Sequence, residues 1–464
     1  MNSKPGSLYR LLLLYFPILF LVSGVASAKG LSGVEASSPT AIPSEATSTP
    51  KASAPSFGHS PDGSLAATSY LGAEMRLDPS PECDSGDQSW PAVAHNYRHG
   101  EYMVVWENTW AGGKKDIYAR RVSDSGQLLS WFCVTTGANN RGRPALAYNT
   151  TNDEYLIVWQ HEVSSGVYEV WGRRIKWNGA DLNLPQYAAF KIFSWTNRSF
   201  VAPRAAWNSI DNEYLVVWSA FDTGTLLNTD VACKRVMADG SMPYAHLIVS
   251  NVGAPQEVDI VYNLALNGYL AVWASHGGAT GYDIWGASLD HTGAKMPPGE
   301  FYVYVGGSGQ MTPAVTTNEQ NHYMVVWQHF DNSYTPGDWD IYGRLFQADG
   351  SPASNLFMLS NTADDEMGPD VAADGATQQY LATWHRNAGS QSIIVARLRN
   401  ADGTLATPVN VLYAPGWKAL AQAVACDIPG FLIAYEKGSG WVPYHIYGRR
   451  WVPSVVFLPL VLRQ

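Results

Sequence analysis

A short apolar segment that ends in an aromatic residue recurs seven times along this chain of 464 residues. The copies are EYMVVW at Trp106, EYLIVW at Trp159, EYLVVW at Trp218, GYLAVW at Trp273, HYMVVW at Trp327, QYLATW at Trp384 and GFLIAY at Tyr435. Successive copies lie 51 to 59 residues apart. A repeat of this length indicates one supersecondary unit that stacks on its neighbours, because a single unit cannot bury its own apolar faces.

Each copy lies between two further segments with strand character. The preceding segment is rich in Ala and Val, as in WPAVAHN from Trp90, RPALAYN from Arg143 and TPAVTTN from Thr312. Small side chains suit the innermost strand of a propeller blade, where strands crowd around an axis. The following segment, as in DIYARRV from Asp116 and DIYGRLF from Asp340, alternates apolar and polar residues. This alternation is typical of a half-exposed strand.

A glycine then follows at a nearly fixed place in six copies: Gly126, Gly179, Gly240, Gly293, Gly350 and Gly403. Glycine accepts the positive φ that tight hairpin turns need. A fourth apolar segment comes next, for example LFMLS from Leu356. Four antiparallel strands repeated seven times predict an all-β fold, a seven-bladed β-propeller of four-stranded antiparallel blades over residues 60–452.

The seventh copy has no glycine turn after its third strand, so another part of the chain must complete this blade. Pro61-Asp62-Gly63 has the composition of the missing turn, and Ser69–Leu77 has that of the missing fourth strand. We therefore predict that an N-terminal strand closes the ring. The alternative is that the apolar tail supplies this strand through Val455–Leu462.

The N-terminal sequence predicts export. Lys4 and Arg10 precede an apolar stretch, and Ala26-Ser27-Ala28 is typical of a cleavage site, so residues 1–28 are predicted to be a signal peptide. An N-terminal membrane anchor is the alternative. Residues 29–59, rich in Ser, Pro, Ala and Thr, are expected to form a flexible linker. Residues 453–464 are an apolar C-terminal tail, too short for a helix that crosses a bilayer.

We thus expect a mature chain without a transmembrane span, extracellular or at the cell surface. Loss of Lys4 and Arg10 with the signal peptide would change the formal net charge from −10 to −12. This acidic balance argues against a nucleic-acid partner, because phosphate binding needs clustered Lys and Arg. The expected partner is an extracellular glycan or protein, and the expected state is a monomer.

The repeat unit resembles that of propeller-forming proteins exported by bacteria, whose units read roughly Y-L-V-V-W and then D-I-Y-G-R-R-V. The resemblance covers about residues 60 to 452. It implies the architecture and assigns no catalytic residue. The chain lacks the Ser-x-Asp-x-Gly-x-Thr-Trp box of sialidases, and it contains no Gly-x-Ser-x-Gly, His-Glu-x-x-His, phosphate-loop or dinucleotide motif.

In a propeller, the loops that leave the second strand and those that enter the first strand lie on one face around the axis, where a site is expected. Several Trp residues outside the repeated row fall in or beside these loops: Trp90, Trp110, Trp195, Trp339, Trp417 and Trp441. An indole ring can stack on a sugar or anchor a protein partner. The alternative is that these rings pack between blades.

Histidines and acids follow closely behind the core aromatic residues and are expected in loops of the same face. The candidate ligand-binding residues are His161, His329, His385, Glu107 and Glu436. If they converged on the axis they could ligate a divalent cation. The alternative is that they cap strand ends.

Three functional hypotheses follow. The first is an extracellular, non-catalytic propeller that binds a polysaccharide or a surface protein. The second is a secreted glycan hydrolase or lyase with its site on the loop face near the axis. The third is a structural module of the cell surface.

Overall fold

The computed structural model describes residues 70–78, 86–180, 182–225, 228–251, 256–276, 281–318, 322–331, 337–389, 391–406, 410–411, 418–427, 430–439 and 442–452. All of these residues belong to the unit Ser53–Gln464. The predicted signal peptide, linker and C-terminal tail lie outside the described residues, as does Pro61-Asp62-Gly63. No helix in the described part of the chain has the length and hydropathy that a membrane crossing requires.

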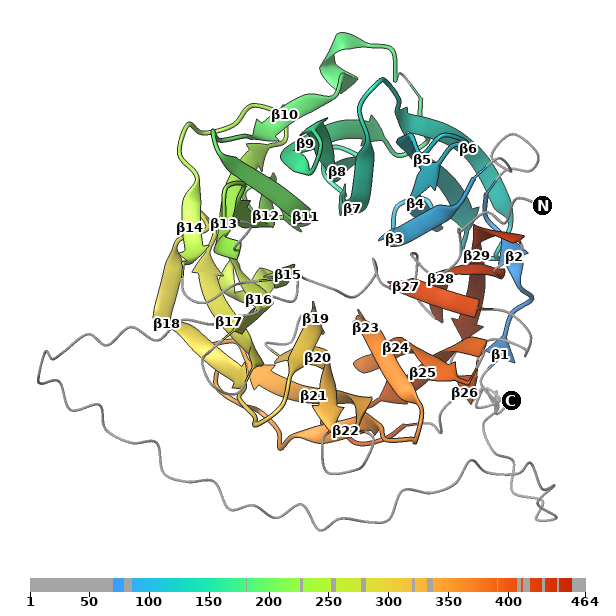
Figure 1. Ribbon diagram of the computed structural model, residues 1–464, viewed down its shortest axis with the longest axis vertical. Helices are drawn as coiled ribbons and strands as arrows, with labels where there is room; N and C mark the ends of the chain where they lie inside the picture. The colour runs from blue at the N-terminus through green and yellow to red at the C-terminus, as the bar shows by residue number, and fades with distance from the viewer. Residues whose placement is uncertain are drawn as a thin grey trace, which may run out of the picture. The chain divides into compact units, whose positions relative to one another are not determined.

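The described residues form seven antiparallel blades around a common centre, as the repeat predicts (Figure 1). Blade 1 consists of β3 (Gln88–Asn96), β4 (Glu101–Thr109), β5 (Lys115–Ser123) and β6 (Leu128–Thr135). Blade 2 consists of β7 (Arg141–Asn149), β8 (Glu154–Ser164), β9 (Val167–Lys176) and β10 (Phe190–Phe193), with a 3-10 turn η1 (Pro185–Tyr187) before β10. Blade 3 consists of β11 (Arg198–Asn208), β12 (Glu213–Asp222), β13 (Asn228–Met237) and β14 (Leu247–Ser250).

Blade 4 consists of β15 (Gln256–Asn263), β16 (Gly268–His276), β17 (Tyr282–Asp290) and β18 (Lys295–Tyr304), with η2 (Leu264–Leu266) after β15. Blade 5 consists of β19 (Gln310–Thr317), β20 (His322–Asp331), β21 (Asp338–Gln347) and β22 (Phe357–Ser360). Blade 6 consists of β23 (Asp365–Asp374), β24 (Gln379–Ala388), β25 (Gln391–Arg399) and β26 (Asn410–Val411). Blade 7 consists of β27 (Lys418–Asp427), β28 (Gly430–Ser439) and β29 (Val442–Val452), completed by β1 (Tyr70–Leu71) and β2 (Met75–Arg76).

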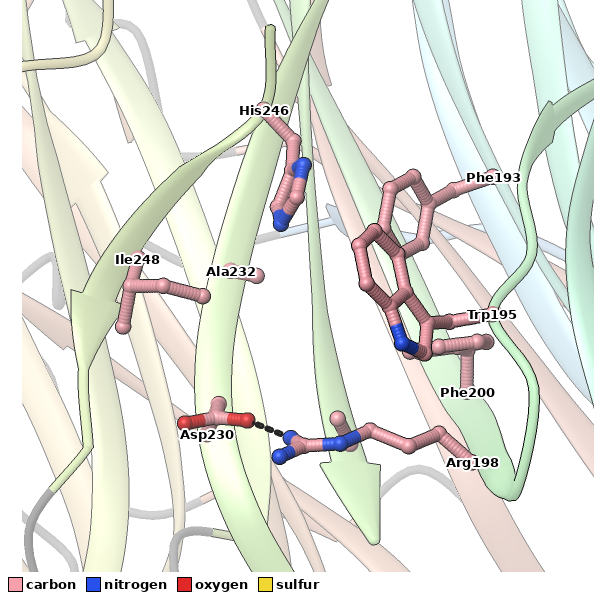
Figure 2. A pocket seen from close by; sticks show the side chains of 9 residues that line it. Phe193, Trp195, Arg198, Phe200, Asp230, Ala232, His246 and Ile248 are labelled. Atoms are coloured by element: carbon pink, nitrogen blue, oxygen red, sulfur yellow. Dashed lines mark hydrogen bonds and ion pairs between the residues drawn. The ribbon is translucent and has the colours of Figure 1, made fainter.

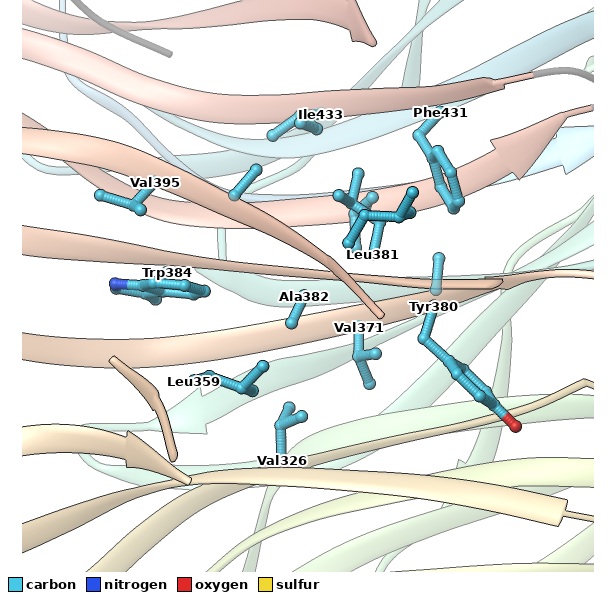
Figure 3. Close-up of a cluster of buried hydrophobic side chains, with 14 of the residues drawn as sticks. Val326, Leu359, Val371, Tyr380, Leu381, Ala382, Trp384, Val395, Phe431 and Ile433 are labelled. Atoms are coloured by element: carbon cyan, nitrogen blue, oxygen red, sulfur yellow. The ribbon is translucent and has the colours of Figure 1, made fainter. Parts of the chain in front are cut away.

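The repeated Trp row forms the core between blades, as expected for faces that one blade cannot bury alone. All six Trp side chains are at most 1 % exposed: Trp106, Trp159, Trp218, Trp273, Trp327 and Trp384. The apolar clusters span neighbouring blades, and the cluster in Figure 3 joins Val326 of blade 5, Trp384 of blade 6 and Ile433 of blade 7. The core is therefore a ring of interfaces between sheets.

The predicted turn glycines have φ between +73° and +87°, which confirms their role. All six also lie against the preceding blade. A Cβ on Gly350 would come within 2.7 Å of the Phe301 ring, and one on Gly403 would come within 3.2 Å of the Phe357 ring. The turns at Gly350 and Gly403 thus need glycine for their backbone conformation and for close approach to the preceding blade.

The N-terminal strand closes the ring, as predicted, because β1 and β2 pair antiparallel with β29. Leu77 follows these strands and is fully buried between blades 7 and 1 in a cluster that includes Tyr102 and Ile446. The Arg120 guanidinium of blade 1 donates a hydrogen bond to the Leu77 carbonyl at 3.1 Å. The alternative closing segment, Val455–Leu462, lies outside the described residues.

Replacing Leu77 with Ala is expected to lower the free energy of unfolding by about 2–3 kcal/mol, because the change leaves a cavity at the closing interface. Denaturant unfolding of the two proteins measures the difference. Leu128→Ala is the matched control, since Leu128 is 36 % exposed on β6. Equal losses in the two variants would contradict a closing role for Leu77.

Candidate functional site

The candidate His and Glu residues lie in strands rather than in the loops that the sequence suggested. The second strand of each blade continues past the core aromatic residue, so that β4 extends to Thr109 and β8 extends to Ser164. The other second strands continue in the same way through His329, His385 and Glu436. These side chains are therefore held in the sheet of their own blade.

Glu107 and Glu436 join neighbouring blades. The Glu436 carboxylate accepts a hydrogen bond from the Trp90 backbone N–H at 2.8 Å, and the Glu107 carboxylate accepts one from the Arg143 N–H at 3.3 Å. Gln160 accepts from the Ala202 N–H at 3.1 Å, and Gln328 accepts from the Gly368 N–H at 3.0 Å. In these four blades, the residue that immediately follows the core aromatic residue in sequence thus connects its blade to the inner strand of the next blade.

A β-bulge in the inner strand makes this contact possible. In six blades one bulge residue has φ between +48° and +59°: Trp90, Arg143, Ala202, Glu257, Thr312 and Gly368. A bulge leaves one residue out of the ladder, which frees its N–H for a partner elsewhere. Side chains of the preceding blade supply that partner in the four contacts described above.

The three histidines do not converge. His161 in blade 2 is 9 % exposed and packs on the Trp171 ring, with ring centroids 4.7 Å apart. His329 in blade 5 packs on Tyr342, and His385 in blade 6 is buried. Burial lowers the pKa of both His161 and His329, which favours the neutral imidazole. Among the residues that the structure describes, no group of three His, Cys, Asp or Glu side chains could hold a metal ion.

The candidate Trp residues have separate environments. Trp110 is half-buried, and its Nε1–H donates a hydrogen bond to Asp116 at 2.8 Å. Trp339 is half-buried against the Phe330 ring, with centroids 5.3 Å apart. Trp417 and Trp441 lie outside the described residues. Trp195, in contrast, is 61 % exposed.

Trp195 lines a pocket of about 260 Å³ on blades 2 and 3 (Figure 2). Apolar side chains from both blades form part of its wall, among them Phe193 at the end of β10 and Phe200 on β11. The Phe193 ring also stacks on the core Trp218, with centroids 5.0 Å apart. Trp195 therefore stands beside an aromatic surface that the core holds in place.

Polar groups line another part of the same pocket. Arg198 at the start of β11 forms an ion pair with Asp230 on β13. His246 precedes β14, with its ring centroid 5.9 Å from that of Trp195. Burial lowers the pKa of His246, and the nearby Lys234 ammonium lowers it further. A neutral imidazole offers one donor and one acceptor. The pocket combines an exposed indole with neutral and paired polar groups.

The sequence indicated Trp195 and missed the rest of the pocket. Asp230 lies near the start of its third strand, at the repeated position of Asp116 and Asp340, but Arg198 and His246 come from segments that vary from blade to blade, so no repeat links the three. Only the fold places them around Trp195.

No family model matches the sequence, and neither does any curated protein. Solved structures do match the fold. A protein of unknown function from Dyadobacter fermentans shares 10 % identity, with a TM-score of 0.52 over 83 % of this chain and 99 % of that one. The polysaccharide lyase Uly1 shares 9 % identity, with a TM-score of 0.51 over 83 % of this chain and 100 % of that one. At these identities the comparisons show the β-propeller fold alone.

Proposed function

We propose that this chain is an extracellular, non-catalytic β-propeller that binds a glycan through the Trp195 pocket. The proposal rests on the exposed indole of Trp195. Three polar side chains line the same pocket, those of Arg198, Asp230 and His246. Export remains the expectation of the N-terminal sequence and is part of the proposal.

The chemistry of the pocket favours a neutral sugar. The apolar face of a pyranose ring can stack on an indole, while its hydroxyls need donors and acceptors at the edge. Arg198 and Asp230 neutralise each other, so the pocket presents hydrogen-bonding groups without an excess of charge. A volume of about 260 Å³ lies just below the usual range for ligand pockets, which favours a single sugar unit of a longer chain.

Replacing Trp195 with Ala is expected to weaken binding of a neutral glycan at least tenfold, because the stacking surface is lost. A glycan array with the secreted wild-type protein identifies the ligand, and calorimetry then measures both affinities. Tyr97→Ala is the matched control, since Tyr97 is 63 % exposed on the β3–β4 turn and takes no part in the pocket. Undiminished binding by Trp195→Ala, or no glycan bound by the wild type, would contradict the proposal.

A further inference from the structure

The Trp195 pocket lies on the seam between β10 and β14, the outermost strands of blades 2 and 3. These strands occupy equivalent places, each paired antiparallel with the third strand of its blade, so the two run in the same direction. Figure 2 shows Phe193 and Trp195 on one side of the pocket and His246 and Ile248 on the other. The Phe193 and His246 rings meet across the seam, with centroids 4.5 Å apart. This contact fixes which residues of the two segments lie at the same level.

The residues that precede this contact continue the seam beyond the pocket. Phe190 comes three residues before Phe193 on β10, and Tyr244 comes two residues before His246. An extended chain advances about 3.3 Å per residue, so the two residues lie at most roughly 7–10 Å from the Phe193–His246 contact. Because the two segments run in the same direction, Phe190 and Tyr244 lie beyond the same end of the pocket.

Apolar side chains and one ammonium group border this part of the seam. Phe190 and Met242 are half-buried and pack against the core cluster of blades 2 and 3 that contains Trp218. Lys234 on β13 supplies the polar group, since its ammonium lies 5.9 Å from the centre of the Phe193 ring. An ammonium can donate hydrogen bonds to sugar hydroxyls. The seam thus offers apolar surface and a hydrogen-bond donor directly beside the pocket.

Tyr244 differs from its neighbours in the same segment. Its side chain is fully exposed, whereas Met242 packs against the core and His246 lines the pocket. A single exposed apolar residue is common on protein surfaces and indicates nothing alone. Tyr244 is set apart by its place, because the chain bends at this residue beside a pocket that already has an exposed aromatic ring, that of Trp195. Two exposed aromatic rings along one seam suit a ligand with repeating units that have apolar faces.

We infer that Tyr244 is a second stacking platform and that the seam binds at least two consecutive units of a neutral glycan. This inference rests on the proposed function of the Trp195 pocket. The first unit stacks on Trp195, and the second stacks on Tyr244, with Lys234 as a donor to its hydroxyls. The pocket itself has room for one unit, at about 260 Å³, so a longer chain must leave it. The seam is the exit along which the next unit meets an aromatic ring.

Calorimetry with the wild type and two variants tests the inference, with oligomers of glucose, galactose and mannose from one to four units long as probes. We expect the wild type to bind an oligomer more tightly than the single unit of the same sugar. Tyr244→Ala should bind the oligomer roughly three- to tenfold more weakly, because one stacking contact is lost, and should bind the single unit as the wild type does. Trp195→Ala should weaken the binding of both.

Tyr244→Phe separates stacking from hydrogen bonding by the phenol, because it keeps the ring, and it should bind the oligomer as the wild type does. A loss in Tyr244→Phe as large as in Tyr244→Ala would overturn the stacking role. Equal affinities of the wild type and Tyr244→Ala for the oligomer, with Trp195→Ala still impaired, would overturn the inference and leave the proposed function intact. If the wild type binds none of the probes, or if Trp195→Ala binds them undiminished, the proposed function fails and the inference fails with it.

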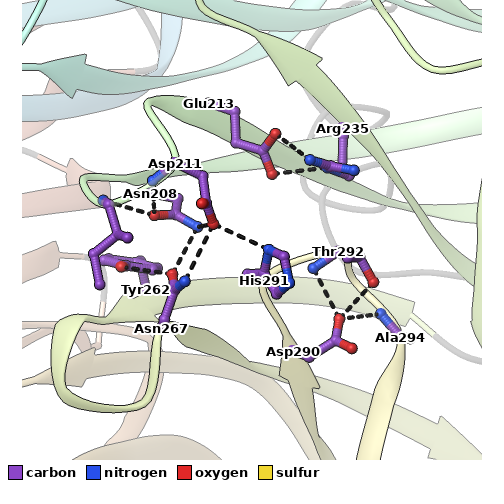
Figure 4. Close-up of polar contacts among 11 residues, drawn as sticks. Asn208, Asp211, Glu213, Arg235, Tyr262, Asn267, Asp290, His291, Thr292 and Ala294 are labelled. Atoms are coloured by element: carbon purple, nitrogen blue, oxygen red, sulfur yellow. Dashed lines mark hydrogen bonds and ion pairs between the residues drawn. The ribbon is translucent and has the colours of Figure 1, made fainter.

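Ile210→Ala is the control on the same blade. Ile210 is 56 % exposed in the turn between β11 and β12, the two inner strands, whereas Tyr244 precedes the outermost strand. This turn is fixed to the next blade, since the Asn208 amide donates to Asn267 at 3.0 Å and the Asn267 amide donates to Asp211 at 3.2 Å (Figure 4). Circular dichroism confirms that each variant is folded. Ile210→Ala should bind every oligomer as the wild type does, and a loss equal to that of Tyr244→Ala would overturn a specific role for Tyr244.

Discussion

Replacing Trp218 with Ala is expected to lower the free energy of unfolding by about 3–5 kcal/mol, as for other large truncations in a core. Trp218 is fully buried on β12, and its ring stacks on Phe193 of the preceding blade. The change therefore removes the largest fully buried side chain of the interface between blades 2 and 3. A cavity at this interface has few ways to collapse, because the closed ring restrains how far the two sheets can approach.

Urea unfolding of the two proteins, followed by Trp fluorescence and circular dichroism, measures the difference. Trp195→Ala is the matched control, because the same residue type is lost from a site that is 61 % exposed. This control should change the free energy of unfolding by less than about 0.5 kcal/mol. A loss below 1 kcal/mol in Trp218→Ala would show that the Trp row does not carry the core.

The periodic parts of the fold could be predicted from the sequence. Every blade must bury two faces against its neighbours, so each second strand repeats the same apolar run around a Trp such as Trp106 or Trp327. The missing turn of the last copy and the spare strand near Tyr70 likewise indicated how the ring closes. Packing imposes these features on every copy, and repetition makes them visible.

The site could be predicted only in part, because most of its residues lie where the blades differ. Trp195 stood out as an aromatic outside the Trp row, but nothing in the sequence connects it to His246, some 50 residues later. Glu107 and Glu436 were expected in loops because the apolar run stops at the aromatic residue. The strands continue beyond it, and the inner-strand bulge of the next blade gives these carboxylates a backbone partner. Five of the six bulge residues precede a proline, as in Trp90-Pro91, but a proline is equally compatible with the start of a strand.

The contact with the bulge N–H also buries the Glu436 carboxyl close to other negatively charged side chains. Burial raises the pKa of Glu436 to about 8, and the charges of Glu107 and Asp87 add to the effect, while the Trp90 N–H opposes it. Lys115 partly compensates the pair, since its ammonium lies 2.6 Å from the Glu107 carboxylate. Asp370 at the axis has a pKa raised to about 7 for related reasons.

A raised carboxyl pKa means that the folded state binds more protons than the unfolded state, whose Glu ionises near pH 4.3. Below that pH the Glu436 carboxyl is protonated in both states and does not change the free energy of unfolding. As the pH rises towards about 8, where Glu436 ionises in the fold, its effect lowers the free energy of unfolding. Since one pKa unit corresponds to about 1.4 kcal/mol, we expect the loss of stability due to Glu436 to approach about 5 kcal/mol at alkaline pH.

Glu436→Gln isolates this contribution, because the amide oxygen can still accept the Trp90 N–H but the side chain cannot ionise. We expect the variant to unfold at a higher denaturant concentration than the wild type at pH 9 and at a similar one at pH 5. Glu169→Gln is the control for the chemical change itself, since the Glu169 carboxylate pairs with the exposed Lys191 ammonium on the surface and contacts no bulge N–H of the described strands. A wild-type stability that is flat from pH 5 to pH 9 would show that the Glu436 carboxyl is solvated, and hence that the bulge contact between blades 7 and 1 is open to water.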